Sequence, residues 1–149
     1  MSIMKKISNI SYGFTLIELL IVISIIAVLT GISIFAMQNA RRSGRDARRK
    51  ADLETIRAAL EIYKADCNQY PASLPAPGSQ LQATCTGVTN IYLRSVPGDP
   101  STLARYVYCP SGVPSTSYNL YSHLEDSSDT FTGCVTCDPT PCRYQLLSP

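Results

Sequence analysis

The chain has few of the residues that enzymes use most often for proton transfer. It contains no tryptophan and a single histidine, His123, among 149 residues. Because histidine is the commonest general acid or base, little remains in the sequence for that chemistry. His123 lies in a β-rich stretch, where we expect it to have a surface or packing role. We therefore predict no catalytic residues and favour a structural or binding protein over an enzyme.

Proline and cysteine are absent from the first part of the chain. The first cysteine is Cys67, and all ten prolines lie at or after Pro71. Proline inside a helix removes a backbone hydrogen bond and clashes with the preceding turn, so its absence permits one long N-terminal helix. Beyond Pro71 the many prolines predict turns and short strands.

The sequence is rich in apolar residues near its N-terminus. Residues 14–37 read FTLIELLIVISIIAVLTGISIFAM, with Glu18 as their single charge. A helix of this length extends about 36 Å, which is enough to cross a hydrocarbon core of about 30 Å. A carboxylate in such a helix costs on the order of 2.5–3.5 kcal/mol at the bilayer centre, so Glu18 is a candidate functional residue. We predict a hydrophobic transmembrane helix over 14–37, longer than the apolar part of an ordinary signal peptide.

The junction before this run resembles a processing site. Gly13 and Phe14 are followed by Glu18, the fifth residue after the glycine, within GFTLIELLIVISIIAVL. This pattern resembles the N-terminus of the type IV pilin and pseudopilin family. The resemblance implies that residues 1–13 are a leader cleaved after Gly13 by a prepilin peptidase, and that the new Phe14 amine is methylated. It also implies extraction from the membrane into a helical filament.

Glu18 then has a proposed role in filament register. In a filament it can pair with the Phe14 amine of a neighbouring subunit, because two buried charges that are costly alone become tolerable as a pair. The alternative is a chance carboxylate near the membrane surface. Phe35 stands where many family members have a proline, which leaves the course of the helix at that point open.

The helical pattern continues beyond the apolar run. Residues 38–70 contain no proline, and one face repeats apolar side chains at helical spacing: Leu53, Ile56, Leu60 and Tyr63. We expect an amphipathic continuation that ends near Asn68, followed by a globular head over 71–149. The predicted fold is α+β and pilin-like: a long N-terminal helix whose second half packs against a small antiparallel β-sheet. In that head, residues 71–87 are expected to form a turn-rich connector. The order of these segments is also similar to that of the major pseudopilin of type II secretion.

The helix carries a cluster of positive charge just after the apolar run. Such residues favour the cytoplasmic side of a membrane, whereas the cysteines and the processing motif favour an extracytoplasmic head. We give the cysteines and the processing motif more weight, and therefore expect the head on the extracytoplasmic side. The protein is then a single-pass membrane protein before assembly and part of an extracellular or periplasmic filament afterwards. The cluster is interpreted as a solvated helix face or a subunit contact, with anionic lipid or, less favoured, DNA phosphates as alternatives. Its members are Arg41, Arg42, Arg45, Arg48, Arg49 and Lys50.

All six cysteines lie beyond the apolar run. An even number in a loop-rich domain behind a membrane-type segment is typical of disulfides in an oxidising compartment. One pairing that would tie the helix end to the connector is Cys67–Cys85. The sequence CVTCDPTPC also permits a metal knuckle or a redox pair, although no histidine is close and its prolines oppose a following helix. The disulfide candidates are Cys67, Cys85, Cys109, Cys134, Cys137 and Cys142.

An acidic stretch, LEDSSD, offers weak calcium candidates. Glu125, Asp126 and Asp129 supply the hard oxygen ligands that calcium prefers, and calcium in a C-terminal loop is also implied by the resemblance to type II secretion pseudopilins. The spacing matches no EF-hand, and a solvated turn is the favoured interpretation. We expect no resident cofactor.

The function predicted from these observations is structural. We expect a subunit of a type IV pilus or pilus-like filament, with a type II secretion or competence pseudopilin as the alternative. A membrane-anchored thiol or metal domain is the alternative from a different class. The implied partners are copies of the same chain, the prepilin peptidase and methylase, an inner-membrane assembly platform and, before assembly, membrane lipid.

Overall fold

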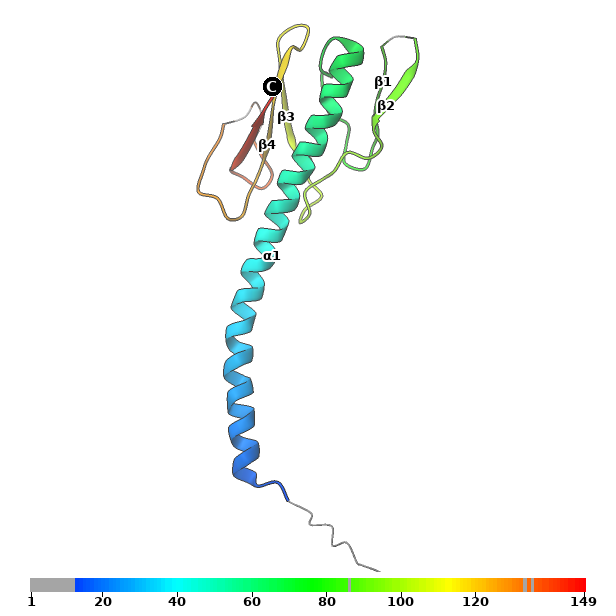
Figure 1. Ribbon diagram of the computed structural model, residues 1–149. Helices are drawn as coiled ribbons and strands as arrows, with labels where there is room; N and C mark the ends of the chain where they lie inside the picture. Colours follow the sequence, from blue (N-terminus) through cyan, green and yellow to red (C-terminus); the bar gives the residue numbers. More distant parts are fainter. Residues whose placement is uncertain (1–12, 86, 133, 135) are drawn as a thin grey trace, which may run out of the picture. The chain divides into compact units, whose positions relative to one another are not determined.

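A computed structural model describes residues 13–85, 87–132, 134 and 136–149. The first twelve residues of the predicted leader lie outside this part of the chain. The structure divides into two units, of which the first ends at Asn39 and the second extends from Ala40 to Pro149. Its elements, shown in Figure 1, are α1 (Leu16–Cys67), β1 (Leu81–Thr84), β2 (Thr89–Leu93), β3 (Val107–Ser111), β4 (Ser117–Ser122) and β5 (Tyr144–Leu147).

The helix α1 has 52 residues and contains both the apolar run and its amphipathic continuation. It passes through Phe35 and Gly44 without a break in helical assignment. It ends at Cys67, where Asn68 takes a left-handed conformation with φ 56° and donates its N–H to the carbonyl of Lys64 at 2.8 Å. This is the asparagine form of the C-terminal cap. The prediction of one long N-terminal helix is confirmed.

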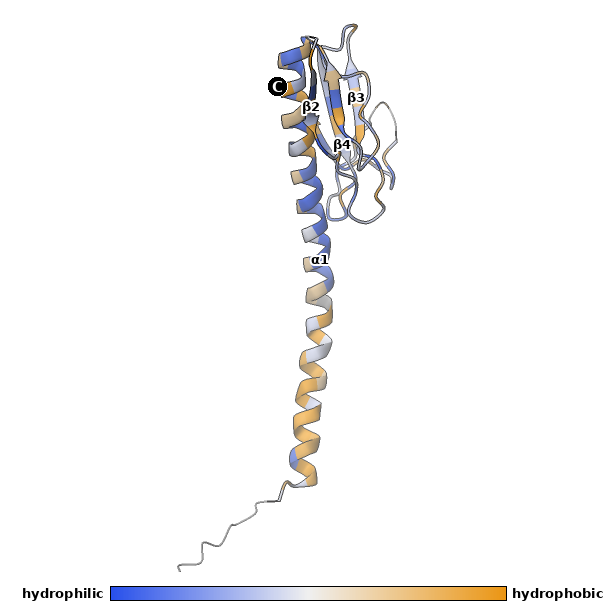
Figure 2. Cartoon of the chain, turned by 90° about the vertical axis from the view of Figure 1, so that its right-hand side faces the viewer, coloured by the Kyte–Doolittle hydropathy of each residue, from blue (hydrophilic) through white to orange (hydrophobic). Residues whose placement is uncertain are grey.

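In the first unit the helix is apolar on all sides except for one hydrophilic position near its start (Figure 2), where Glu18 lies in the first turn. Its polar side chains are satisfied by the helix itself: the hydroxyls of Ser24, Thr30 and Ser33 each donate to a carbonyl four residues earlier, at 2.7–2.8 Å. Because a bilayer core supplies no water to such groups, internal hydrogen bonds are what that environment requires. By length and composition this stretch suffices to cross a membrane, although a signal sequence near an N-terminus has the same character.

The second unit packs the C-terminal part of α1 against two antiparallel sheets. One sheet is the hairpin β1–β2, and the other has the order β3-β4-β5. In Figure 2 the strands lie on one side of the helix, and in Figure 1 the hairpin and the three-stranded sheet lie to the right and left of α1. The expectation of one small sheet is therefore corrected to two. Residues 81–84, expected within a connector, form strand β1.

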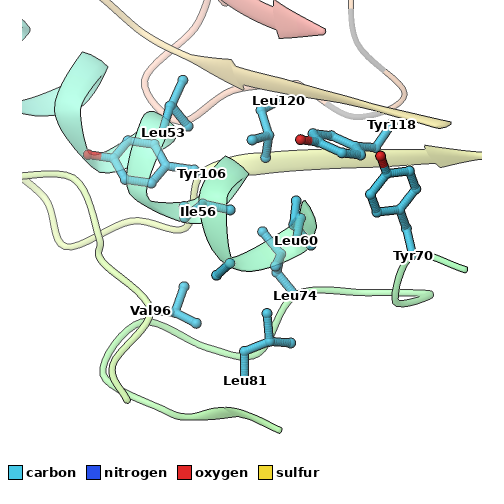
Figure 3. Packing of buried hydrophobic residues seen from close by; sticks show 11 residues of the cluster. Leu53, Ile56, Leu60, Tyr70, Leu74, Leu81, Val96, Tyr106, Tyr118 and Leu120 are labelled. Atoms are coloured by element: carbon cyan, nitrogen blue, oxygen red, sulfur yellow. The ribbon is translucent and has the colours of Figure 1, made fainter. Parts of the chain in front are cut away.

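The core lies between α1 and both sheets. Leu53, Ile56 and Leu60 are fully buried on the inner face of the helix. They meet Tyr118 and Leu120 of β4 on one side (Figure 3). On the other side the same cluster includes Leu74, Leu81 and Val96. The predicted apolar stripe is therefore the packing face of the helix, and it holds both sheets at once.

Tyrosine hydroxyls from the head bind carboxylates on α1 at the edges of this core. Tyr118 donates to Glu61 at 2.9 Å, and Tyr106 donates to Asp52 at 2.8 Å. Burial, assisted by these carboxylates, raises the pKa of both tyrosines above the ordinary value. The hydroxyls therefore stay protonated and can donate to the carboxylates. The apolar part of each tyrosine ring packs in the core, and its hydroxyl keeps a hydrogen-bond partner.

A buried arginine connects α1 to two loops of the head. Arg49 is 1% exposed and donates to Asp99 and Asp46 at 2.6 Å and to Glu125 at 2.9 Å. Arg45 donates to Glu125 at 2.7 Å. These two arginines were expected to belong to a solvated or subunit-contact face. That expectation is wrong for both, because each side chain meets a carboxylate from the head.

Replacing Arg49 should strongly destabilise the head. An Arg49→Met variant leaves three carboxylates without their shared cation, a change that costs about 3–5 kcal/mol when one partner of a buried ion pair is removed. Equilibrium denaturation of the full chain in detergent should show this loss. The matched variant Arg48→Met, one residue away and exposed, should stay within about 0.5 kcal/mol of the unaltered protein. Equal effects of the two substitutions would contradict the role assigned to Arg49.

Candidate functional site

The junction between the predicted leader and the apolar helix is accessible. Residues 13–15 precede the first turn of α1 and have no regular secondary structure. The Phe14 side chain is 74% exposed, and no atom lies within 4 Å of the position that a Cβ on Gly13 would occupy. The bond between these two residues therefore lies in an open, non-helical segment, the kind of conformation that a peptidase can bind.

Glu18 forms a capping box with Thr15. The Thr15 hydroxyl and backbone N–H both face the Glu18 carboxylate, at 3.1 and 3.4 Å, and the Glu18 N–H donates to the Thr15 hydroxyl at 3.3 Å. Thr15 is thus the N-cap of α1, and Glu18 occupies the third helical position, as in the S/T-x-x-E motif. A carboxylate there also interacts favourably with the positive end of the helix dipole.

This capping role was missed in reading the sequence, although the signal was present. The residues TLIE, from Thr15 to Glu18, match the capping pattern immediately before an apolar run. The carboxylate is therefore not an isolated charge in the single chain. The carboxylate accepts hydrogen bonds from the Thr15 N–H and hydroxyl, while the Thr15 hydroxyl accepts from the Glu18 N–H, and these contacts reduce the cost of placing the charge beside apolar residues.

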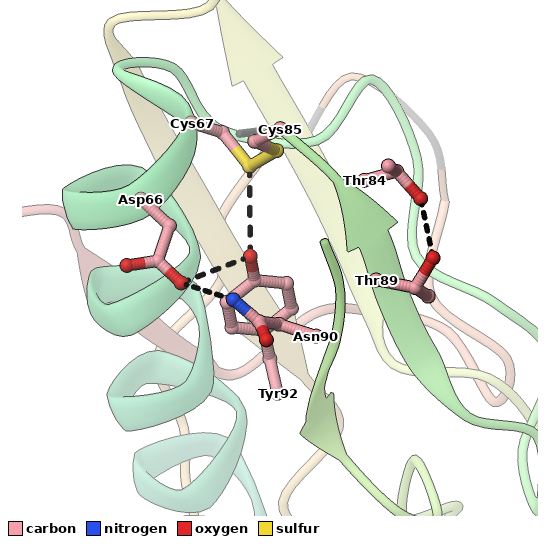
Figure 4. The surroundings of a disulfide bond; sticks show 7 residues. All are labelled: Asp66, Cys67, Thr84, Cys85, Thr89, Asn90 and Tyr92. Atoms are coloured by element: carbon pink, nitrogen blue, oxygen red, sulfur yellow. Dashed lines mark hydrogen bonds between the residues drawn. A yellow bond between two sulfur atoms is a disulfide. The ribbon is translucent and has the colours of Figure 1, made fainter. Parts of the chain in front are cut away.

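The six cysteines form three disulfides, and none is free. Cys67–Cys85 joins the end of α1 to the end of β1, with Cα atoms 5.0 Å apart. In Figure 4, Asp66 lies beside this bridge and accepts hydrogen bonds from Asn90 and Tyr92 of β2, both at 3.1 Å. The covalent and polar contacts together hold the hairpin against the helix end.

The other two bridges are Cys109–Cys134 and Cys137–Cys142. Cys109 lies on β3, and the remaining three cysteines lie in the segment between β4 and β5. Cys134 and Cys137 are therefore joined to different partners rather than to each other. A thiol redox pair or a thiolate metal site at CVTC needs these sulfurs free, and in this arrangement they are not.

The acidic stretch after β4 is held by cations from the helix. Arg45 and Arg49 bind the Glu125 carboxylate, and Asp46 accepts hydrogen bonds from the backbone N–H groups of Glu125 and Asp126, at 2.9–3.0 Å. The hydrogen bond from Arg45 lowers the pKa of Glu125 to about 2, against the opposing effect of burial and with help from Arg49. Glu125 is thus an ion-pair partner of the helix.

The remaining calcium candidates, Asp126 and Asp129, are exposed. They border an open cavity of about 540 Å³ that is also lined by Lys50 and Arg143. Within the part of the chain that the structure describes, no group of three or more histidine, cysteine, aspartate or glutamate side chains could hold a metal ion. His123, the single histidine, places Nδ1 2.8 Å from the carbonyl oxygen of Pro141, a packing contact between two loops.

Comparison with known protein families agrees with this architecture. Residues 9–34 match the prokaryotic N-terminal methylation motif. Residues 36–134, about two thirds of the chain, match the family model for protein G of the type II secretion system. The chain belongs to the type II secretion system protein G family. Members of this pilin and pseudopilin family are structural subunits, not enzymes.

Individual relatives carry both pseudopilin and pilin names. The type II secretion system core protein G of Dickeya chrysanthemi is 24% identical over 72% of this chain and 83% of its own length. That of Klebsiella pneumoniae is 30% identical over 59% of this chain and 67% of its own length. The type IV wide pilus major component PilA4 of Thermus thermophilus is 42% identical over 52% of this chain and 60% of its own length. No solved structure matches the chain.

Membership of the protein G family implies assembly into a filament and processing by a prepilin peptidase. The apolar part of α1 fits anchoring in a membrane. In this protein G homologue the head is connected to the helix by the Glu125 and Arg49 ion pairs and by the Cys67–Cys85 bridge.

Acid should remove the stabilisation that Glu125 provides. Its pKa falls from 4.5 to about 2 on folding, so the stabilisation is complete above about pH 5 and is lost as the pH falls toward 2. Between pH 7 and pH 3 the free energy of unfolding should therefore fall by about 2 kcal/mol more in the unaltered chain than in Glu125→Gln. Urea denaturation of the full chain in detergent measures this difference.

The control for this measurement is Glu54→Gln. Glu54 is exposed and lies 3.7 Å from Arg57 in a surface pair, so its loss should leave the pH dependence unchanged. If Glu125→Gln shows the same loss on acidification as the unaltered protein, the ion pairs of Glu125 do not stabilise the head as described.

Proposed function

We propose that this protein is a structural subunit of a type IV pilus or pilus-like filament. In this proposal a prepilin peptidase cleaves after Gly13, the Phe14 amine is methylated, and residues 14–37 hold the subunit in the inner membrane before assembly. The observation that carries the proposal is the accessible Gly13–Phe14 junction, followed by a helix that is apolar on all sides except at Glu18.

The capping box describes the contacts of the Glu18 carboxylate before the proposed charge pairing forms. In the single chain the Glu18 carboxylate binds Thr15, which keeps a negative charge at the start of the helix. Cleavage before Phe14 creates a cationic amine next to this charge. In a filament the carboxylate of one subunit can bind the amine of its neighbour, and the pair sets the axial register because either charge alone is costly in an apolar surrounding.

The outward side of α1 in the head offers a surface for a neighbouring helix. Opposite the buried core residues, it presents small exposed side chains at Ala47, Ala51, Ala58 and Ala65. Spacings of four and seven residues keep these positions on one side of a helix. Small residues let two helices approach closely, which supports polymerisation through α1 with further copies of the chain.

We assign one role to each of the four predicted segments. Residues 1–13 are the leader, 14–37 the membrane and polymerisation helix, 38–70 the amphipathic helix and 71–149 the disulfide-containing head. Three disulfides in this head support an extracytoplasmic position. Export and extraction then require an inner-membrane assembly platform as a partner, and the assembled filament is periplasmic or extracellular.

A secretion pseudopilus is the second candidate for this filament. The specific observation that favours it is the match of residues 36–134 to protein G of the type II secretion system. The relative from Thermus thermophilus, named as a wide pilus component, favours a pilus instead. A competence pseudopilin would use the same N-terminal chemistry.

Two substitutions separate the charge of Glu18 from its capping role. Glu18→Gln keeps a side chain that can complete the capping box but removes the negative charge, so it should abolish incorporation into filaments. Thr15→Ala removes the cap hydroxyl and costs the helix start about 1 kcal/mol, but it keeps the charge and should still assemble. Sheared-filament yield, normalised to the amount of subunit in the membrane, measures both.

Normal filament yield from Glu18→Gln would refute the charge-pairing proposal. Loss of assembly in Thr15→Ala alone would show that the cap, rather than the charge, is required. Membrane insertion of both variants should equal that of the unaltered chain, because residues 14–37 remain apolar.

A further inference from the structure

Among the arginines that the second unit contributes from helix α1, three form no ion pair with a described acidic residue. Arg45, Arg49 and Arg57 form ion pairs with carboxylates. Arg41, Arg42 and Arg48 are exposed and take part in none of these pairs. We call these three residues the arginine collar. The arginines of the positive cluster thus divide into two, Arg45 and Arg49, that form ion pairs with the head, and three, Arg41, Arg42 and Arg48, that form none with the described residues.

The arginine collar follows directly after the apolar segment in the sequence. Arg41 comes four residues after Met37, the last residue of the apolar run, with Gln38, Asn39 and Ala40 between them. All of these residues belong to the uninterrupted helix α1. When residues 14–37 span a bilayer, Arg41 and Arg42 lie about 6–8 Å past the end of the span along the helix, at the level of the lipid head groups, and Arg48 lies about 16 Å past it, on the solvent side of that level. The long arginine arms can extend back toward the interface while their aliphatic stems cover apolar surface.

We propose that the arginine collar binds the head groups of anionic phospholipids on the head side of the membrane before assembly. This inference rests on the proposed function, because it requires that residues 14–37 span a membrane. Guanidinium groups bind phosphate through paired hydrogen bonds, and basic residues next to a membrane span attract anionic lipid electrostatically. The collar would hold the base of the head at the membrane surface until the subunit is extracted.

Charge distribution in the rest of the head favours lipid over a nucleic acid. After Pro71 the chain has three basic and five acidic side chains. Two of these acidic residues, Asp99 and Glu125, are paired with helix arginines, so the rest of the head has no excess of positive charge. A nucleic acid needs many of its phosphates neutralised to bind, and the described part of the head beyond the helix offers no positive surface for this. A lipid head group needs only the short positive segment at the membrane. The basic residues are also concentrated where a bilayer surface, rather than an extended polymer, would meet them.

The test uses the full chain in nanodiscs with equal amounts of phosphatidylcholine and phosphatidylglycerol. The lipids retained by the protein after mild detergent extraction are counted by native mass spectrometry. The unaltered chain should retain phosphatidylglycerol over phosphatidylcholine by about fivefold or more, and Arg41→Gln/Arg42→Gln/Arg48→Gln should bring the ratio close to one. High salt should lower the ratio for the unaltered chain, because exposed charges are screened.

The matched control is Arg57→Gln/Arg94→Gln/Arg105→Gln, which removes the same charge from positions further along the chain. Arg94 and Arg105 are exposed, and this variant should keep the phosphatidylglycerol preference. The proposal would be overturned if the unaltered chain and the collar variant retained phosphatidylglycerol and phosphatidylcholine in the same ratio. It would also be overturned if both triple variants lost the phosphatidylglycerol preference equally. A collar variant that keeps its lipid preference but fails to form filaments would also overturn it, by assigning the arginines to subunit contacts.

This measurement is independent of processing and polymerisation. A chain that spans the nanodisc but assembles into no filament still reports its lipid preference, so failure of the filament proposal and failure of the lipid proposal give different results. Added duplex DNA should not change the ratio. Displacement of phosphatidylglycerol by DNA at equal phosphate concentration would contradict the assignment to lipid.

Discussion

One uninterrupted helix, α1, has an apolar first part and a second part that packs against the sheets of the head. The rest of the structure depends on this change of surroundings along the helix. The first unit of α1 is apolar on every side except at Glu18, with its serine and threonine hydroxyls bonded to its own carbonyls. The second buries one face against two sheets and leaves the opposite face small and exposed. The first part is suited to lipid or to neighbouring helices and the second to a folded head, and the proposed change from membrane anchor to filament subunit depends on both.

Two charged groups of this helix have hydrogen-bond partners within the chain. At its start Glu18 binds Thr15, and within the head Arg49 binds carboxylates from α1 and from two loops. The two sites differ in what they leave available. Arg49 is enclosed by its carboxylates, whereas Glu18 is exposed and, among the described residues, its carboxylate is hydrogen-bonded only by the neutral Thr15. The proposed pairing with a neighbouring amine would replace that neutral partner. An exposed carboxylate with a replaceable partner is what assembly through charge pairing requires.

Much of the fold was predictable because its strongest signals are long or periodic. The helix was indicated by the apolar run, by the repeat of Leu53, Ile56 and Leu60, and by the absence of proline before Pro71. Strand β1 was missed because four residues give too short a pattern to separate from a turn-rich segment. The inward position of Arg49 was missed for another reason: its partners Asp99 and Glu125 are 50 and 76 residues away, and a charged residue ordinarily indicates a solvated face. The capping box at Thr15 and Glu18 was local and could have been read directly.

The most direct test of the central claim is the mass of the mature N-terminus. The protein is purified from sheared filaments or from the membrane fraction of cells with an intact assembly system, digested and analysed by tandem mass spectrometry. The account predicts a chain that begins at Phe14, with one methyl group on its α-amine and without residues 1–13. An exported protein that still carries Met1, or one cleaved at a position other than Gly13, would contradict it.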